Sequence, residues 1–189
     1  DDTYFKNANF QGIPQNGYLE LFKNMLDHSK IKIELESNFS IYKDKKFDYI
    51  IYTGPIDEYF DNIFGKLEYR TLNFKNEIHD GDFQGNAVMN YCDLDFPWTR
   101  ITEHKYFTPE KQFEQTFISK EFSVEDDGKA PYYPIRDKKN LEMLSKYQKL
   151  MENEKKTIFV GRLAMYQYYD MDQVVAATMK KFNEFIKGI

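Results

Sequence analysis

The sequence predicts an α+β fold in which helices flank an antiparallel β-sheet. The first reason is that several strand-like segments follow one another in the middle of the chain, while helix-like segments lie towards its two ends. The second is that a doubly wound parallel sheet would need strands and helices to alternate, and the middle of this chain has no such alternation. With 189 residues, the chain is long enough for one domain with its own core or for one substantial piece of a larger protein.

Helices are expected where apolar residues recur every three or four positions. This spacing occurs over residues 17–28, 140–154 and 170–185. In the second of these segments the apolar positions form one continuous face, which predicts an amphipathic helix packed on a core. A shorter helix is expected over residues 56–64, closed by Gly65.

Strands are expected in the shorter apolar segments. They cover residues 31–35, 38–42, 47–55, 67–74, 86–92, 99–107, 115–122 and 156–161. Residues 67–74 carry polar and apolar side chains on both faces, so we expect that strand to be partly covered on each side. The polar segment 123–134, with Asp126, Asp127 and Gly128 at its tip, is expected to be an exposed loop.

The composition argues against several functional classes. A net charge of -5 and the lack of a dense block of lysine and arginine argue against a nucleic-acid-binding surface. The single cysteine, Cys92, excludes an intrachain disulfide and fits a reducing, cytoplasmic setting. No apolar run reaches about 18 residues, so no membrane span is expected. Because the chain starts with DDTYF and no methionine, we expect it to be a piece of a longer protein.

The usual signatures of catalysis and metal binding are missing from the sequence. It has no G-x-G-x-x-G motif, no phosphate-binding P-loop and no nucleophile elbow. Its three histidines are scattered, and the one cysteine has no second cysteine to share a metal. We therefore assign no catalytic residue and no metal ligand.

Aromatic and basic residues instead suggest a site for an anion. Tyrosine and phenylalanine supply 15 and 17 residues, and several tyrosines lie in polar surroundings. Arg100 follows PWT, Arg162 follows a glycine, and tyrosines precede the helix that starts near Asp170. Helix N-termini and arginine forks both favour phosphate groups. Two interpretations stay open for any single tyrosine, a hydroxyl that binds a ligand or a ring in an aromatic core. Arg100 can form only a surface ion pair at a strand end, and Asp170 can act simply as an N-cap.

A family resemblance rests on six segments that span most of the chain. They read FQGIPQNGY, YTGPIDEYF, LEYRTLNF, GNAVMNYCDLDFPWTRITEHKYF, PYYPI and FVGRLAMYQYYDMDQVVAA. In this order they resemble the bacterial UDP-galactopyranose mutases, from residue 2 to about residue 182. The resemblance implies a cytoplasmic, FAD-dependent isomerase that interconverts UDP-galactopyranose and UDP-galactofuranose for cell-surface polysaccharides. It also implies that N5 of the reduced flavin acts as the nucleophile and that UDP is the leaving group.

The resemblance also assigns residues to sites. It implies substrate contacts for Tyr4, Asn90, Arg100, Tyr133 and Tyr168. It implies FAD contacts for Arg162, Asp170, Met171, Asp172, Gln173, Val174, Val175 and Ala176. The dinucleotide-binding G-x-G-x-x-G region of the family, its mobile loop and one of its two diphosphate arginines are not in this chain. Residues 1–189 are thus expected to form the sheet domain only, and to be inactive alone.

A second function class remains open. The chain could belong to a non-catalytic module that binds a sugar nucleotide or a protein with the same sheet fold. The missing dinucleotide fingerprint favours this alternative for the isolated chain, whereas the retained ligand positions favour the enzyme for the parent protein. No nucleic-acid or membrane partner is expected, and a homodimer is one option for the full-length protein.

Overall fold

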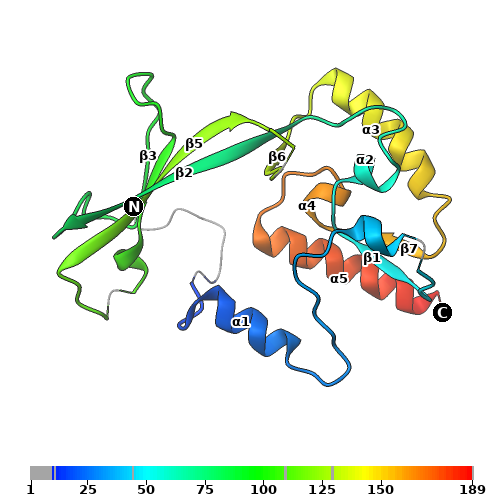
Figure 1. Cartoon of the computed structure of the whole chain (residues 1–189), viewed down its shortest axis with the longest axis horizontal. Coiled ribbons are helices and arrows are strands. Elements are labelled where there is room, and N and C mark those ends of the chain that lie inside the picture. Colours follow the sequence, from blue (N-terminus) through cyan, green and yellow to red (C-terminus); the bar gives the residue numbers. More distant parts are fainter. Residues whose placement is uncertain (1–9, 11, 44, 109, 129, 189) are drawn as a thin grey trace. The chain divides into compact units, whose positions relative to one another are not determined.

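The computed structural model describes residues 10, 12–43, 45–108, 110–128 and 130–188, and it confirms the α+β class (Figure 1). The chain divides into two compact units. The first unit comprises the described parts of Asp1–Lys45, Asn76–Met89 and Ile101–Ser119, and the second comprises Lys46–Lys75, Asn90–Arg100 and Lys120–Ile189. Each unit is described by itself below.

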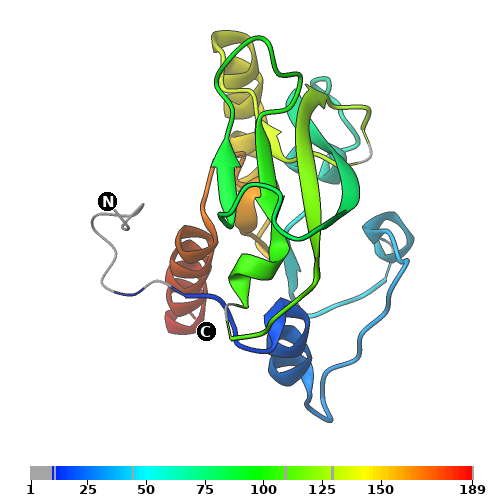
Figure 2. The same ribbon diagram turned by 90° about the vertical axis from the view of Figure 1, so that its left-hand side faces the viewer.

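A five-stranded sheet has the strand order β3-β4-β5-β2-β6, and its strands can be followed in Figure 2. Its members are β2 (Tyr69–Asp80), β3 (Val88–Asn90), β4 (Arg100–Glu103), β5 (Gln115–Glu125) and β6 (Tyr133–Pro134). β6 pairs with β2 in antiparallel register, with Arg70 opposite Tyr133. This short strand places Tyr133 at a fixed position beside the start of β2.

The second unit also contains a parallel pair, β1 (Ile50–Tyr52) with β7 (Thr157–Phe159). Parallel neighbours need a long crossover, and here the chain between them includes α2 (Ile56–Tyr59) and α3 (Lys138–Met151). After β7 come α4 (Gly161–Ala164) and α5 (Met171–Lys187). The core of this unit is built from six buried residues, Ile56, Leu67, Tyr69, Leu144, Tyr147 and Tyr166.

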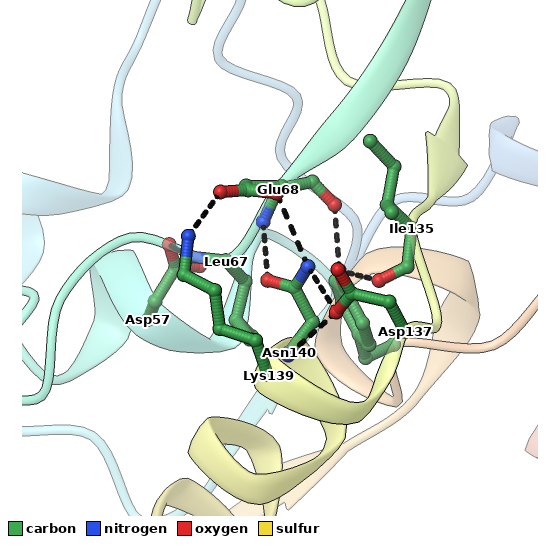
Figure 3. A network of polar contacts seen from close by, with 8 residues as sticks. Asp57, Leu67, Glu68, Ile135, Asp137, Lys139 and Asn140 are labelled. Atoms are coloured by element: carbon green, nitrogen blue, oxygen red, sulfur yellow. Dashed lines mark hydrogen bonds and ion pairs between the residues drawn. The ribbon is translucent and has the colours of Figure 1, made fainter.

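Helix α3 begins where it does because Asp137 caps it (Figure 3). The Asp137 carboxylate accepts hydrogen bonds from the backbone and side-chain N–H groups of Asn140, both at 2.8 Å. The buried Asn140 in turn accepts a hydrogen bond from the backbone N–H of Glu68 at 3.1 Å, and Lys139 pairs with the Glu68 carboxylate at 2.5 Å. These contacts join the start of α3 to the residue preceding β2.

The first unit contains α1 (Gly17–Leu26) and two short 3₁₀ helices, η1 (Phe39–Tyr42) and η2 (His104–Phe107). Its most buried side chains include Ile101, Ile118 and Glu103. The Glu103 carboxylate accepts backbone hydrogen bonds from Phe83, Gln84 and Gly85 at 2.8–3.1 Å. A buried carboxylate therefore fixes the turn that follows β2.

Two predicted strands are wrong. Within the described residues, 31–35 form no strand, and most of 38–42 forms η1 instead. Alternating polarity predicts a strand only if a neighbouring strand pairs with it and a core covers one face. Residues 31–35 are all exposed, so their alternation has nothing to pack on. The strand expected over 99–107 ends at Glu103, and η2 follows it.

The other predicted elements are confirmed with shifted ends. β2 continues to Asp80, well beyond the expected end at residue 74. Residues 123–134, which were expected to form a loop, contain β6, and helix α4 was not expected. Among the described residues, the structure contains no helix whose length and hydropathy would let it cross a membrane.

Candidate functional site

Tyr133 is held at the edge of β2 by the backbone on both sides of it. The N–H of Tyr132 donates to the carbonyl of Arg70 at 3.0 Å, and the N–H of Ile135 donates to the carbonyl of Glu68 at 3.0 Å. Prolines flank the two tyrosines in the sequence and restrict the backbone further. The half-buried ring of Tyr133 therefore projects from a rigid segment.

Tyr166 fixes the segment that carries Tyr168. Its side chain is fully buried, and its hydroxyl donates to the carbonyls of Glu68 at 2.6 Å and Ile135 at 2.8 Å. Its own carbonyl accepts a hydrogen bond from Arg136 at 2.5 Å. With a φ of 50°, Tyr166 lies in the left-handed region, which turns the chain between α4 and α5. The same backbone that anchors Tyr133 thus anchors the loop of Tyr168.

Tyr133 and Tyr168 stack on each other, and we call them the tyrosine pair. Their ring centroids lie 5.2 Å apart, with an angle of 29° between the ring planes. The guanidinium of Arg162 lies 5.5 Å from the ring centre of Tyr133 and 5.2 Å from that of Tyr168. Tyr168 is 57% exposed, so this is an aromatic and cationic surface open to solvent rather than a core contact.

Arg162 lies in α4, because β7 ends at Phe159 and α4 begins at Gly161. Its Nε donates to the carbonyl of Tyr169 at 3.1 Å, and its Nη2 donates to the same oxygen. Its Nη1 donates to the carbonyl of Tyr132 at 3.2 Å. The guanidinium therefore joins the two segments that carry the tyrosine pair.

Arg100 begins β4 and lies between two polar partners. Its Nε donates to the side-chain oxygen of Asn90 at 2.9 Å, and its Nη1 lies 3.6 Å from a carboxylate oxygen of Glu121. The Arg100 side chain is 42% exposed, whereas that of Glu121 is only 14% exposed. The arginine is thus oriented by its neighbours and still faces solvent.

Electrostatics link these groups around Tyr133. Burial raises the pKa of the Tyr133 hydroxyl, and the nearby Glu121 and Tyr168 raise that pKa further. Arg100 and Arg162 act in the opposite direction and lower it. All four side chains are therefore close enough to influence one phenol. The structure brings together Arg100, Tyr133, Arg162 and Tyr168, and Asn90 joins them through Arg100.

The start of α5 carries the remaining sequence-predicted residues. Asp170 and Gln173 form a capping box, in which the Asp170 N–H donates to the Gln173 side chain at 2.9 Å. The Asp170 carboxylate in turn accepts the backbone N–H of Gln173. Met171 and Val175 are 67% and 57% exposed, and none of the described residues of α5 is buried. The N-cap prediction for Asp170 is confirmed, whereas Tyr4 lies outside the described residues.

Two guanidinium groups and two phenols can bind an anion, but they offer no nucleophile. Within the part of the chain that the structure describes, no three His, Cys, Asp or Glu side chains are grouped to hold a metal ion. Sequence reasoning missed Glu121 as the ion-pair partner of Arg100. Glu121 lies on β5, the neighbour of β4, and only the strand register shows that the two side chains meet.

Comparisons with known proteins agree on one family. The family model of UDP-galactopyranose mutase matches residues 1–168. The chain is 43% identical, over its full length, to a Klebsiella pneumoniae protein named "Probable UDP-galactopyranose mutase", and covers 49% of that protein. It is 40% identical, again over its full length, to a dTDP-fucopyranose mutase of Escherichia coli, of which it covers 52%. It is 33% identical over 97% of its length to a UDP-galactopyranose mutase of Mycoplasma genitalium, of which it covers 50%. The chain thus spans about half the length of the curated relatives it matches.

Proposed function

Because the chain belongs to the UDP-galactopyranose mutase family, we propose that it forms the diphosphate-binding part of an enzyme that interconverts UDP-galactopyranose and UDP-galactofuranose. The observation that carries this proposal is the group of Arg162 and Tyr168 around Tyr133, with Arg100 held by Asn90 and Glu121 on the same sheet. A diphosphate needs positive charge and hydroxyl donors on one face, and this group offers both.

Arg100 is the residue that neutralises the diphosphate in this proposal. Its exposed fork can bond two phosphate oxygens at once. Asn90 holds the Nε end of the guanidinium, so the remaining donors are oriented before a ligand arrives. When the bond between the anomeric carbon and the phosphate oxygen breaks, negative charge grows on that oxygen, and a preoriented arginine stabilises it.

The hydroxyls of the tyrosine pair complete the diphosphate site. Among the described residues, neither Tyr133 nor Tyr168 uses its hydroxyl in a hydrogen bond, so both can donate to phosphate oxygens. Burial raises the pKa of Tyr133, so this phenol stays protonated at neutral pH. Its hydroxyl is thus available as a donor, which phosphate binding requires.

The residues at the start of α5 fit one side of a flavin. The half-buried or exposed residues 171–176 follow directly on the capping box, and the apolar Met171 and Val175 are free to cover a ring system. The first-turn N–H groups of a helix attract phosphate oxygens. Reduced FAD, when bound, would supply the nucleophile for the anomeric carbon. Arg162 retains N–H groups beyond those bonded to Tyr132 and Tyr169, so it can also meet the cofactor.

The 189 residues alone are expected to lack mutase activity. A ligand as large as FAD needs most of its surface enclosed, and the described residues of α5 leave this side open. The check is to add excess FAD to the isolated chain and to measure the flavin retained after desalting. Stoichiometric retention would contradict this expectation.

A second substrate deserves a parallel assay because one relative at 40% identity is a dTDP-fucopyranose mutase. The gathered arginines and tyrosines would contact the diphosphate, which both sugar nucleotides share. These residues therefore support the reaction class more strongly than the choice of base or sugar. The full-length protein should be assayed with UDP-galactofuranose and with the furanose form of dTDP-fucose.

The decisive variant is Arg100→Ala in the full-length protein. Losing a charge-assisted contact to the leaving group should cost about 3 kcal/mol of transition-state stabilisation or more, which is a fall of at least about a hundredfold in turnover. Turnover by dithionite-reduced protein and bound flavin are measured together, with Arg100→Lys as the matched variant that keeps the charge and loses the fork.

Turnover within a few-fold of the parent would reject the role of Arg100. A parent protein that binds UDP and turns over neither sugar nucleotide would instead support the non-catalytic binding module.

A further inference from the structure

We infer that Arg162 is a positioning residue for the diphosphate site, one that holds the two rings of the tyrosine pair in a fixed relative position. This inference rests on the proposed function, because it assigns the tyrosine pair to the diphosphate. The family resemblance implies that Arg162 contacts the flavin, and the inference adds a role towards the substrate.

The contacts of Arg162 lead to this role. Its guanidinium bonds the carbonyls of Tyr132 and Tyr169, which are the sequence neighbours of Tyr133 and Tyr168. The same guanidinium lies over both rings of the pair, at 5.5 Å and 5.2 Å. One side chain therefore fixes the backbone beside each ring and the faces of both rings.

The segments that Arg162 joins are remote in the sequence. Tyr132 lies 30 positions before Arg162, and Tyr169 lies seven positions after it. Tyr133 comes from β6 and Tyr168 from the loop between α4 and α5, and both of these segments are short. A bond that spans both segments sets the distance between the two hydroxyls, which a diphosphate must match.

Lysine could not perform this function. Arginine has five donors in a planar fork, so it can bond two carbonyls and still present a flat face to aromatic rings. A lysine ammonium is a point charge on a flexible stem and would keep the charge without the geometry. Arg162→Lys thus separates a positioning role from a purely electrostatic one.

The surrounding fold does not depend on Arg162 alone. Tyr166 ties the same loop to Glu68 and Ile135 through its hydroxyl, and Arg136 bonds the Tyr166 carbonyl. The capping box of Asp170 starts α5 without help from Arg162. Removing Arg162 is therefore expected to loosen the tyrosine pair while the rest of the unit stays folded.

The test is a double-mutant cycle in the full-length protein, with UDP as the probe. Tyr168→Phe is expected to weaken UDP binding by about tenfold, and Arg162→Ala and Arg162→Lys by a similar factor. Because a misplaced hydroxyl contributes little, Tyr168→Phe should weaken UDP binding by less than about twofold once Arg162 is alanine. Tyr133→Phe provides the second cycle, and thermal unfolding and retained flavin are recorded for every variant.

Strong coupling in both cycles, with lysine failing to restore affinity, is the expected result. If the losses of UDP affinity in the single variants simply multiply in the double variants, the inference is overturned, while the proposed diphosphate site is unaffected. Restored affinity in Arg162→Lys overturns it in favour of charge alone. Loss of flavin with unchanged UDP affinity overturns it in favour of a cofactor contact. If the unmodified protein does not bind UDP, the proposed function fails, and the inference fails with it.

Discussion

The buried tyrosines of the core and the tyrosine pair at its edge use the same side chain in opposite ways. Tyr166 and Tyr147 are fully buried, and the hydroxyl of each donates to backbone carbonyls, that of Tyr147 to Gly65 at 2.7 Å. Among the described residues, the hydroxyls of Tyr133 and Tyr168 bond no such carbonyl, and their rings stack beside an arginine. The difference separates two tyrosines whose hydroxyls bond the backbone of the fold from two whose hydroxyls stay open to a ligand.

The physical basis of this difference is the cost of burying a polar group. Water cannot reach a phenol in the core, so a partner inside the protein lowers the cost of burying its hydroxyl. Tyr147 and Tyr166 have such partners, whereas the buried hydroxyl of Tyr69 has none among the described residues. A phenol at the edge keeps its hydroxyl in water until a ligand replaces that water. The core tyrosines are therefore expected to determine stability, and the edge tyrosines ligand affinity.

The largest expected effect is that of Tyr166→Ala on stability. Removing a fully buried aromatic ring should lower the free energy of unfolding by about 3–5 kcal/mol, and the carbonyls of Glu68 and Ile135 lose their donor as well. Urea denaturation of the full-length protein, followed by circular dichroism, measures the change.

Tyr168→Ala is the matched control, since it removes the same side chain two positions along the chain, where it is 57% exposed. We expect it to cost about 1 kcal/mol or less. An insoluble Tyr166→Ala variant beside a well-folded Tyr168→Ala variant would agree with the difference between core and edge tyrosines. Equal losses of stability in the two variants would contradict it.

A smaller effect is expected from removing hydroxyls alone. Tyr133→Phe and Tyr168→Phe should each weaken UDP binding by about 1–2 kcal/mol, because each removes one donor and keeps the ring. Isothermal titration of UDP into the full-length protein measures this change. Tyr147→Phe is the control, because it should lower stability and leave UDP affinity unchanged.

The comparison would be overturned if Tyr133→Phe and Tyr168→Phe left UDP affinity unaltered and lowered stability instead. Both rings would then be core residues, which is the alternative that the sequence left open.

The sequence predicted those parts of the fold that local patterns determine. Helices α3 and α5 were predicted because their apolar residues recur with the helical period, and the N-cap of α5 because aspartate suits that position. Residues 31–35 misled because alternation shows an amphipathic pattern and not the presence of a neighbouring strand. Helix α4 is a single turn, too short for periodicity to reveal.

The candidate site was predicted residue by residue only through family resemblance, and its roles remain predictions. The grouping of Arg100, Tyr133, Arg162 and Tyr168 arises from long-range pairing, which no local pattern encodes. Glu121 meets Arg100 because β5 and β4 are neighbours in a specific register. The carbonyls that hold Arg162 belong to the backbone, so no residue type in the sequence could reveal them.

The smallest expected effect concerns pH and extends the comparison from tyrosines to carboxylates. Burial would raise the pKa of Glu103, but hydrogen bonds from the N–H groups of Phe83, Gln84 and Gly85 hold it below its ordinary value of 4.5. Burial raises the pKa of Asp57 above its ordinary value of 3.8, and the hydrogen bonds it accepts, including that from Leu67, only partly offset this. The two carboxylates thus differ in how far hydrogen bonds offset burial, which is the largest influence on both pKa values.

The signs of the two contributions are opposite. The lowered pKa of Glu103 stabilises the fold above pH 4.5, and this contribution is lost as the pH falls through the folded-state value. The raised pKa of Asp57 stabilises the fold below pH 3.8, and this contribution is lost as the pH rises through its folded-state value. Glu103→Gln should therefore lower stability at pH 7 by about 1 kcal/mol and flatten the loss of stability below pH 4.5. Asp57→Asn, which removes the buried charge, should cost less at pH 7 than at pH 3. Urea denaturation of both variants at pH 3, 5 and 7 tests this pattern, and equal pH dependence in the two would show that donor supply does not set the difference.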